Sequence, residues 1–421
     1  MAERRGTWRW PATLALLATS ALAAPALTER QQAEDFDAMW RAVDSGYAYF
    51  GSARAAWKRA RNTWRPRAAA ASRDGFVAAL EGALAELCDD HVGLSERSPA
   101  SPRAIPFETD IWARWKDGAA VVEAVRTFGD ADVAGLRPGQ AITRVDGVPV
   151  ERAVREKLGA ARSTPAARDW AVRQVLAGPR QGIHRLDVRD GNHAATLEIA
   201  RAPPRAANGP AVIGRRMGDD RDIGYVRVRV GAGEEKLVEQ FDAALHYLRD
   251  TRALILDLRE NAGPGSRALT RAILARFAAA ETPWQLREPR GGKRVADTVA
   301  PVEGAPYRGP IAVLVDRWTG GEGEALAAGL QAVAGARLIG TTMAGVRGEL
   351  REVRLPHSGI AVRFPAEKAY QANGAPRESI RPAVAVDLAA PSGGPGDPIL
   401  YQALKLFEKP SPAPGGRSAR D

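Results

Sequence analysis

The 421-residue sequence predicts an α/β protein: a helical N-terminal region and a β-rich middle domain precede a layered core. Three observations lead to this fold class. Apolar residues recur at helical spacing in residues 25–104, short strand-like runs with turn residues fill 105–205, and apolar strands alternate with amphipathic helices in 206–400. Strands interleaved with helices are typical of layered α/β cores, and the length allows two to three domains.

Composition narrows the possible partners. The chain is 45% hydrophobic and 26% charged, as in ordinary globular proteins, and its formal net charge is +10. The arginines are scattered, and no basic block is interleaved with aromatic residues. We therefore expect a solvated, arginine-rich surface and no nucleic-acid partner.

The N-terminus has the pattern of an export signal. Arg4, Arg5 and Arg9 precede an apolar stretch over residues 11–24, and Ala21-Leu22-Ala23 offers a small-x-small cleavage site. This pattern predicts a signal peptide over 1–24, cleaved near Ala23, with a buried N-terminal helix as the alternative. No later apolar run is long enough to span a bilayer, so we expect an exported protein that is periplasmic or secreted.

The only cysteine, Cys88, excludes an intramolecular disulfide and leaves no cysteine at the cleavage site for a lipid. Cys88 lies in an apolar helical run and is expected in the core.

The helical region then ends at a Ser/Pro linker over 98–102. Its predicted apolar faces are formed by Phe36, Met39, Trp40, Val43 and Tyr47, and by Phe76, Leu80, Leu84 and Leu87.

In the core, strands are expected over 225–230, 253–258, 311–315 and 336–340. The helices between them are marked by apolar residues at helical spacing: Leu237, Phe241, Leu245 and Leu248; Leu269, Ile273 and Phe277; Leu326, Leu330 and Val333. The tail over 401–421 becomes rich in Pro, Gly and Ser, and we expect disorder after about residue 410.

Four separated motifs contain the candidate functional residues. They are Asp90-His91-Val-Gly-Leu94, Leu256-Asp-Leu-Arg-Glu-Asn-Ala-Gly-Pro-Gly265, the strand–turn–helix junction Val-Asp-Arg-Trp-Thr-Gly-Gly-Glu-Gly-Glu-Ala-Leu over 315–326, and Pro376-Arg-Glu-Ser-Ile-Arg-Pro382. In order and spacing they resemble the C-terminal processing (tail-specific) serine peptidases, above all the tricorn-core-like branch. The resemblance covers most of the chain after residue 30 and implies a crotonase/ClpP-like spiral core.

The resemblance implies roles for three residues. His91 stands where the family has its general base, and Glu378 matches a glutamate that supports the catalytic assembly. Gly321 stands where the family has its nucleophilic serine, and Glu324 follows at the family's spacing, so the register is secure. Glycine has no side chain and cannot attack. Structural alternatives are a hydrogen-bonded histidine at a helix end for His91 and a surface ion pair for Glu378.

The oxyanion side also departs from the family. Gly263 matches a glycine whose N–H donates to the oxyanion, but the next glycine is replaced by Pro264, which has no N–H. The helix beginning at Glu322 would still present backbone N–H groups to an anion. Glu322 and Glu324 lack further ligands, so we expect charges at a helix start, no metal site and no cofactor.

Residues 134–150, Ala-Gly-Leu-Arg-Pro-Gly-Gln-Ala-Ile-Thr-Arg-Val-Asp-Gly-Val-Pro-Val, resemble the second half of a PDZ domain. The resemblance implies that Gly135 and Leu136 take part in binding peptide ends, as PDZ domains do by adding a strand to a sheet edge. Gln140 departs from the family's usual aspartate. The alternative is a β-rich domain that packs and binds nothing.

Together these features predict an exported peptidase-fold protein that binds peptides or unfolded-protein C-termini and has lost most or all peptidase activity. One alternative is an active hydrolase that uses water activated by His91, or a displaced hydroxyl from Ser95, Thr319 or Thr341. Another is a non-catalytic interaction protein of the cell envelope. The sequence leaves the oligomeric state open.

Overall fold

A computed structural model of the chain describes residues 27–159, 164–201, 210–229, 236–261, 265–304, 307–390 and 396–408. The predicted signal peptide, Gly263 and Pro264, and the tail after residue 410 lie outside the described residues. Within the described part of the chain, no helix is both long and apolar enough to cross a membrane.

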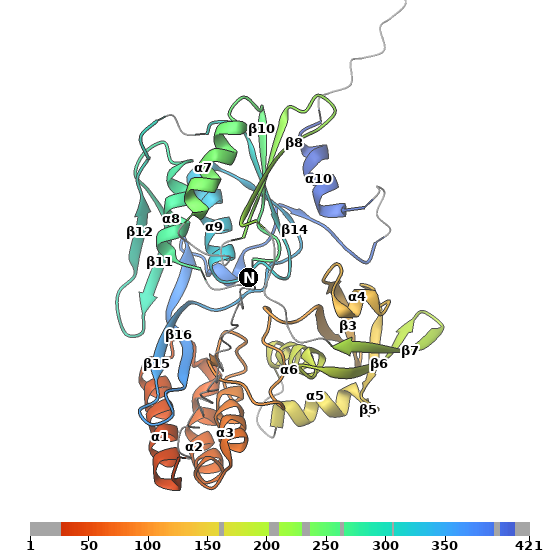
Figure 1. Cartoon of the computed structure of the whole chain (residues 1–421), viewed down its shortest axis with the longest axis vertical. Coiled ribbons are helices and arrows are strands. Elements are labelled where there is room, and N and C mark those ends of the chain that lie inside the picture. The colour runs from red at the N-terminus through yellow and green to blue at the C-terminus, as the bar shows by residue number, and fades with distance from the viewer. Residues whose placement is uncertain are drawn as a thin grey trace, which may run out of the picture.

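The N-terminal region is a helical unit whose first helix begins at a capping box formed by Thr28 and Gln31. The predicted apolar faces meet in its core, where Phe36, Met39, Phe76 and Leu80 are fully buried. Strands of the C-terminal half also enter this core through Phe364, so the helices pack against a hairpin far away in sequence (Figure 1). The elements are α1 (Glu29–Gly46), η1 (Gly51–Ala53), α2 (Arg54–Ala69), α3 (Arg73–Ala85) and β1 (Gly93–Leu94).

The middle domain is a sheet with strand order β2-β3-β4-β6-β7, and β5 pairs with β4. The predicted turn at Asp146-Gly147 joins β4 to β5 with positive φ at both residues (48° and 80°). One edge strand, β2, is flanked by α6, and the carboxylate of Asp169 accepts a hydrogen bond from the Trp115 N–H at 2.8 Å. The elements are β2 (Ile111–Lys116), β3 (Ala119–Val125), α4 (Asp130–Val133), β4 (Ala141–Val145), β5 (Val148–Pro149), α5 (Val150–Leu158), α6 (Pro165–Ala177), β6 (Gly182–Asp190) and β7 (His193–Arg201).

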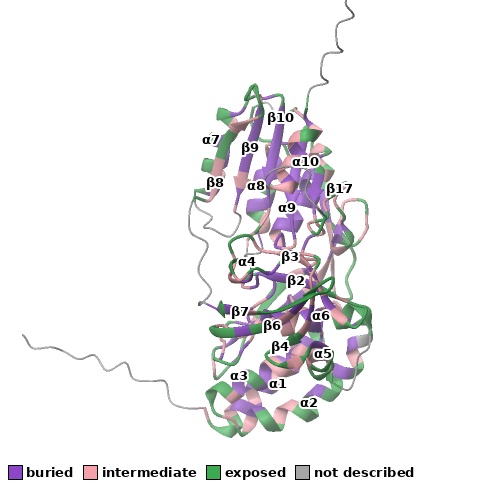
Figure 2. Ribbon diagram, turned by 90° about the vertical axis from the view of Figure 1, so that its right-hand side faces the viewer, coloured by how far each residue is buried: buried purple, intermediate pink, exposed green. Residues whose placement is uncertain are grey.

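The core contains a six-stranded sheet with strand order β17-β14-β13-β10-β9-β8, parallel except for β8. Its central strands β10 and β13 are buried at every residue, as the apolar sequence of β13 and that of β10 up to Asp257 predict. Figure 2 shows β10 as buried. Helices α7, α8 and α9 cover one face and α10 covers the other. The elements are β8 (Val212–Met217), β9 (Ile223–Val228), α7 (Leu237–Tyr247), β10 (Ala253–Asp257), α8 (Arg267–Ala275), β13 (Ile311–Val315), α9 (Glu322–Ala334), β14 (Arg337–Gly340), β17 (Val384–Ala385) and α10 (Pro398–Leu406).

A second sheet connects this core to the helical region. Its order is β1-β16-β11-β12, and β15 pairs with β16 on a separate branch. The strand from the helical region, β1, pairs antiparallel with β16, which places residues 91–94 beside the core. The elements are β11 (Thr282–Pro289), β12 (Val295–Val299), β15 (Glu349–Arg354), β16 (Ala361–Gln371) and η3 (Arg377–Ser379).

The expected strands and helices of the core are confirmed, with boundaries shifted by a few residues. The α/β fold class is also confirmed. The division into domains at residues 104, 205 and 400 stays a prediction. The hairpin β15–β16 belongs to the predicted core region, but it packs into the helical region.

Candidate active site

Gly321 lies at the turn between β13 and α9, where it is the N-cap residue of the helix. Its backbone has φ 56° and ψ −114°, a conformation that residues with a side chain rarely adopt. A Cβ atom added at this position would meet no atom within 4 Å. The turn therefore keeps the sharp strand-to-helix geometry used to present a nucleophile, with open space in place of a side chain.

The Gly321 turn is held by the buried carboxylate of Asp316. Its Oδ1 accepts hydrogen bonds from the Trp318 N–H at 3.0 Å and the Thr319 hydroxyl at 3.1 Å, and burial raises its pKa to about 6. Thr319 is fully buried, and its hydroxyl also contacts the carbonyl of Leu258. Thr319 therefore shapes the loop and is directed away from the reacting position.

The first turn of α9 contains the backbone N–H of Glu322, a hydrogen-bond donor without an acceptor in the described chain, and the buried carboxylate of Glu324, which accepts hydrogen bonds. Among the described residues no acceptor binds the N–H of Glu322, which lies at the N-terminus of the helix dipole. The carboxylate of Glu324 turns back and accepts from the Gly321 N–H at 3.2 Å and the Gly345 N–H at 2.7 Å. Burial raises the pKa of Glu324 to about 7. Glu324 thus holds two backbone turns together.

His91 is buried, and its Nδ1 lies 2.6 Å from the backbone oxygen of Arg347. A carbonyl oxygen can only accept, so Nδ1 carries the proton and Nε2 keeps its lone pair. Burial lowers the pKa of His91, which favours this neutral form near pH 7. Asp89 fixes the loop by accepting from the His91 backbone N–H at 2.9 Å. The ring is therefore prepared to act as a base, oriented by a backbone carbonyl instead of a carboxylate.

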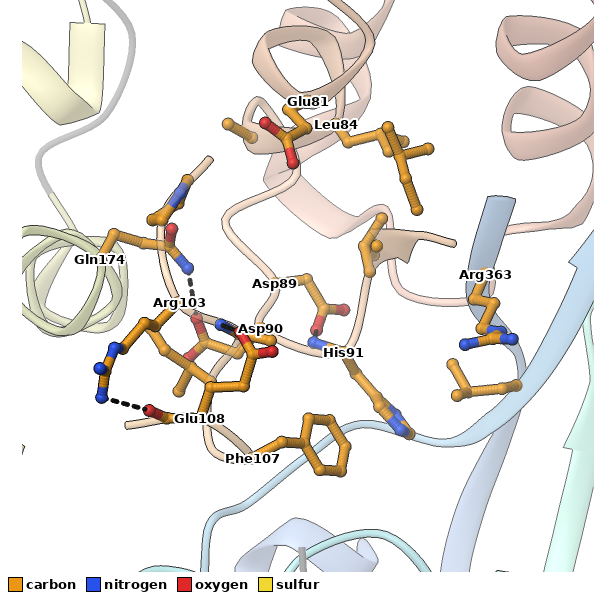
Figure 3. Close-up of a pocket in the computed structure, with 18 of the residues that line it drawn as sticks. Glu81, Leu84, Asp89, Asp90, His91, Arg103, Phe107, Glu108, Gln174 and Arg363 are labelled. Atoms are coloured by element: carbon orange, nitrogen blue, oxygen red, sulfur yellow. Dashed lines mark hydrogen bonds between the residues drawn. The ribbon is translucent and has the colours of Figure 1, made fainter. Parts of the chain in front are cut away.

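His91, Gly321 and Glu322 line one cleft of about 900 Å³. Its core end, as we name it, is formed by these three residues together with Glu349 and Arg377. Its joint end lies where the helical region meets the middle domain, and is formed by Ala78, Glu81, Lys157, Trp170 and Gln174. Figure 3 shows the side chains of His91 and Phe107 projecting from neighbouring loops of the cleft wall.

The structure does not place Glu378 in the cleft wall. One of its oxygens, Oε2, is buried without a hydrogen-bond partner, and no bond joins the residue to His91. Its neighbour Arg377 takes the position at the cleft, where it donates to Glu349 at 2.8 Å and to the carbonyl of Gly348 at 3.0 Å. The sequence interpretation missed Arg377, because an arginine carries no sequence signal for burial.

The buried charges at the core end form one cluster around Arg377. The pKa of Arg377 is raised by its neighbours Glu349, Glu324 and Glu322, against the effect of burial. Burial and the charge of Glu349 raise the pKa of Glu322, whose carboxylate accepts from the Thr270 hydroxyl at 2.7 Å. Among the described residues no group of His, Cys, Asp and Glu is arranged to hold a metal ion.

None of the displaced hydroxyls considered from the sequence lines the cleft. Ser95 bonds to the backbone of Ala361, and Thr341 bonds to the carbonyl of Thr342. Among the described residues, Ser98 is the one hydroxyl side chain in the cleft lining. It is almost fully buried and contacts Ser101.

Gly135 and Leu136 lie away from the cleft. Their backbone N–H groups donate within the α4 turn, to the carbonyls of Asp132 and Ala131 at 3.0 Å each, and the Leu136 side chain is fully buried in the core of the middle domain. Both N–H groups are thus occupied in this structure, and peptide-end binding by Gly135 and Leu136 stays a prediction. Asp169 also occupies a donor of edge strand β2, which a strand-adding peptide would need.

Comparisons with known proteins agree with this fold. Residues 222–386 match the family model described as peptidase family S41. No curated protein matches the chain. The photosystem II D1 C-terminal processing protease is similar in structure, with 20% identity and a TM-score of 0.55 over 85% of this chain and 93% of that chain. Mature CPAF is also similar, with 15% identity and a TM-score of 0.58 over 85% and 92%. At these identities the likeness shows the fold alone.

Proposed function

We propose that this protein, whose residues 222–386 match the model of peptidase family S41, binds polypeptide segments in its cleft and has lost, or almost lost, peptidase activity. The observation that carries the proposal is Gly321. It occupies the N-cap that faces the cleft, and no described hydroxyl replaces the missing one beside it. The loss of a nucleophile from an acyl-transfer site removes orders of magnitude in rate.

The rest of the site supports a binding role. The cleft is of a size that holds ligands in other proteins, and it keeps an anion-accepting helix N-terminus and a neutral histidine. Its natural ligands on this proposal are unfolded segments or C-termini of proteins. Export to the periplasm or medium belongs to the same proposal and rests on the N-terminal sequence. N-terminal sequencing of the exported protein tests it, and an intact Met1 would contradict it.

An active hydrolase is the second candidate, and the geometry of His91 favours it. A histidine with Nδ1 bound to a carbonyl presents an unprotonated Nε2, which could take a proton from water. The N–H of Glu322 could then stabilise the resulting oxyanion.

An assay of the full-length chain against unstructured proteins and peptides separates the two candidates. We expect binding without cleavage for the wild type, and at most weak cleavage for Gly321→Ser, since serine at positive φ is strained by about 1–2 kcal/mol. Gly335→Ser is a matched control: Gly335 ends the same helix at φ 61°, its added Cβ meets no atom within 4 Å, and it lies outside the cleft. Wild-type cleavage that disappears in His91→Ala would show that the protein is an enzyme.

A further inference from the structure

The acidic side chains that line the cleft already have partners. Asp89 accepts from the Tyr47 hydroxyl, and Glu322 accepts from the Thr270 hydroxyl. The others are held by arginines, in the pairs Glu81–Arg97, Asp90–Arg173, Glu108–Arg180, Glu349–Arg377 and Glu352–Arg363. Every acidic side chain in the described cleft lining except Glu322 therefore has an arginine partner, Asp89 through Arg347 at 3.9 Å.

Lys157 is different from the other basic side chains of the cleft. Arg97, Arg103, Arg267, Arg363 and Arg377 each form an ion pair. Lys157 forms no ion pair within the part of the chain that the structure describes, although it lines the same cleft. The joint end therefore carries one positive charge without a counter-ion.

The surroundings of Lys157 make this charge costly. The ammonium lies over the ring of Trp170, 5.8 Å from its centroid, which is a favourable cation–π contact, but burial still lowers the pKa of Lys157. Glu81 and Asp90 are close enough to raise that pKa again, but each is already bound to its own arginine. A partly desolvated ammonium gains most from a ligand that supplies the missing negative charge.

A second donor without an acceptor lies beside it. Trp170 is buried and lines the cleft, and its indole N–H has no hydrogen-bond partner among the described residues. Arg155 stands in the same last turn of α5, is exposed, and pairs weakly with Glu151 at 4.0 Å. A cation near a helix C-terminus stabilises the helix, and Arg155 can supply that cation. Helix stability therefore does not explain why Lys157 is partly buried.

We propose that Lys157 is an anchor for a carboxylate group of the polypeptide that occupies the cleft. The carboxylate is either the C-terminal group of the ligand or an aspartate or glutamate side chain. This inference rests on the proposed peptide-binding function and adds a recognition site at the joint end. It places carboxylate recognition in the cleft, away from Gly135 and Leu136.

Three peptides of one unstructured, apolar sequence test the anchor: a free acid, its C-terminal amide, and an amide with one internal glutamate. Each carries an uncharged coumarin label at its N-terminus, and affinity for the full-length chain is measured by fluorescence anisotropy. We expect the wild type to bind at least one carboxylate peptide about tenfold more tightly than the plain amide, as for a charge-assisted hydrogen bond. Lys157→Gln should abolish that difference, and Lys157→Glu should reverse it.

Arg155→Gln removes a charge from the same helix turn outside the cleft, and it should bind like the wild type. A preference for the free acid identifies the C-terminus as the source of the carboxylate, and a preference for the internal glutamate identifies the side chain. If the wild type binds the peptides but Lys157→Gln changes nothing, the anchor is wrong and the proposed function survives. If the wild type binds none of the three peptides, the proposed function fails together with the anchor.

Discussion

The charged side chains at the core end and at the joint end of the cleft differ in whether they have partners. At the core end, Arg377 is buried and paired with Glu349, and behind it the buried carboxylate of Glu324 accepts hydrogen bonds from two backbone N–H groups. At the joint end, Lys157 has no counter-ion within the described chain and lies partly against an aromatic ring. This difference distinguishes charged groups that stabilise the fold from charged groups that are available to bind a ligand. Saturated charges fix the shape of a site, whereas an unsatisfied charge at a cleft wall offers binding.

The largest expected effect is at the core end. Arg377→Met should lower the free energy of unfolding by about 3–5 kcal/mol, because it leaves the buried carboxylate of Glu324 and the partly buried carboxylates of Glu349 and Glu322 without their shared cation. Urea denaturation of the full-length chain measures this change. Arg363→Met is the matched control, since its ion pair with Glu352 is half exposed and should contribute no more than about 1 kcal/mol. Equal losses in the two variants would show that the core-end cluster is no more structural than the cleft rim.

A smaller, pH-dependent effect is expected at Glu324. Its folded pKa of about 7 lies above the ordinary value of 4.5, so the folded state binds more protons than the unfolded state between these pH values. Stability from this group is therefore full below about pH 4.5 and is lost as pH rises through 7, by up to about 3 kcal/mol. Glu324→Gln cannot titrate and should remove this loss.

The readout is the slope of unfolding free energy against pH, because glutamine also costs one backbone hydrogen bond at every pH. Relative to wild type, Glu324→Gln should gain stability as pH rises from 5 to 8. Parallel curves for the two proteins over this range would contradict a raised pKa for Glu324, and with it the buried, saturated character of the core end.

The smallest expected effect is at the joint end. Lys157→Met should leave the free energy of unfolding unchanged or slightly higher, because the substitution removes a partly buried charge that has no counter-ion in the described chain. Its thermal unfolding midpoint compared with that of Arg155→Met measures this. A clear loss of stability in Lys157→Met alone would mean that the lysine is structural, which would end the contrast between the two ends of the cleft.

Local patterns predicted much of the fold. The apolar runs of residues 253–258 and 311–315 fall on β10 and β13, and the helical spacing at Phe36 and Met39 falls in the helical core. The strands β11, β12, β15 and β16 were not predicted, because their sequences mix apolar and charged residues and they are fixed by long-range pairing.

The site was predicted in part. The sequence left open whether His91 reaches the Gly321 loop; in the structure His91, Gly321 and Glu322 line one cleft, although they come from the helical region and the core. Glu378 does not reach the cleft lining, and Leu136 is a core residue, because neither motif carries information about side-chain direction. No sequence pattern singled out Lys157. What distinguishes it is that it has no ion-pair partner in the described chain, and only the tertiary structure reveals that.

The sequence by itself determined that Gly321 cannot act as a nucleophile, because the absence of a hydroxyl is a covalent fact that no fold can change. Local periodicity also determined the main strands and helices of the core, β10 and β13 among them. Only the tertiary structure decided which charges are saturated and which are not. Arg377 and Lys157 are both basic side chains, and their different surroundings depend on desolvation and on neighbours contributed by other segments of the chain.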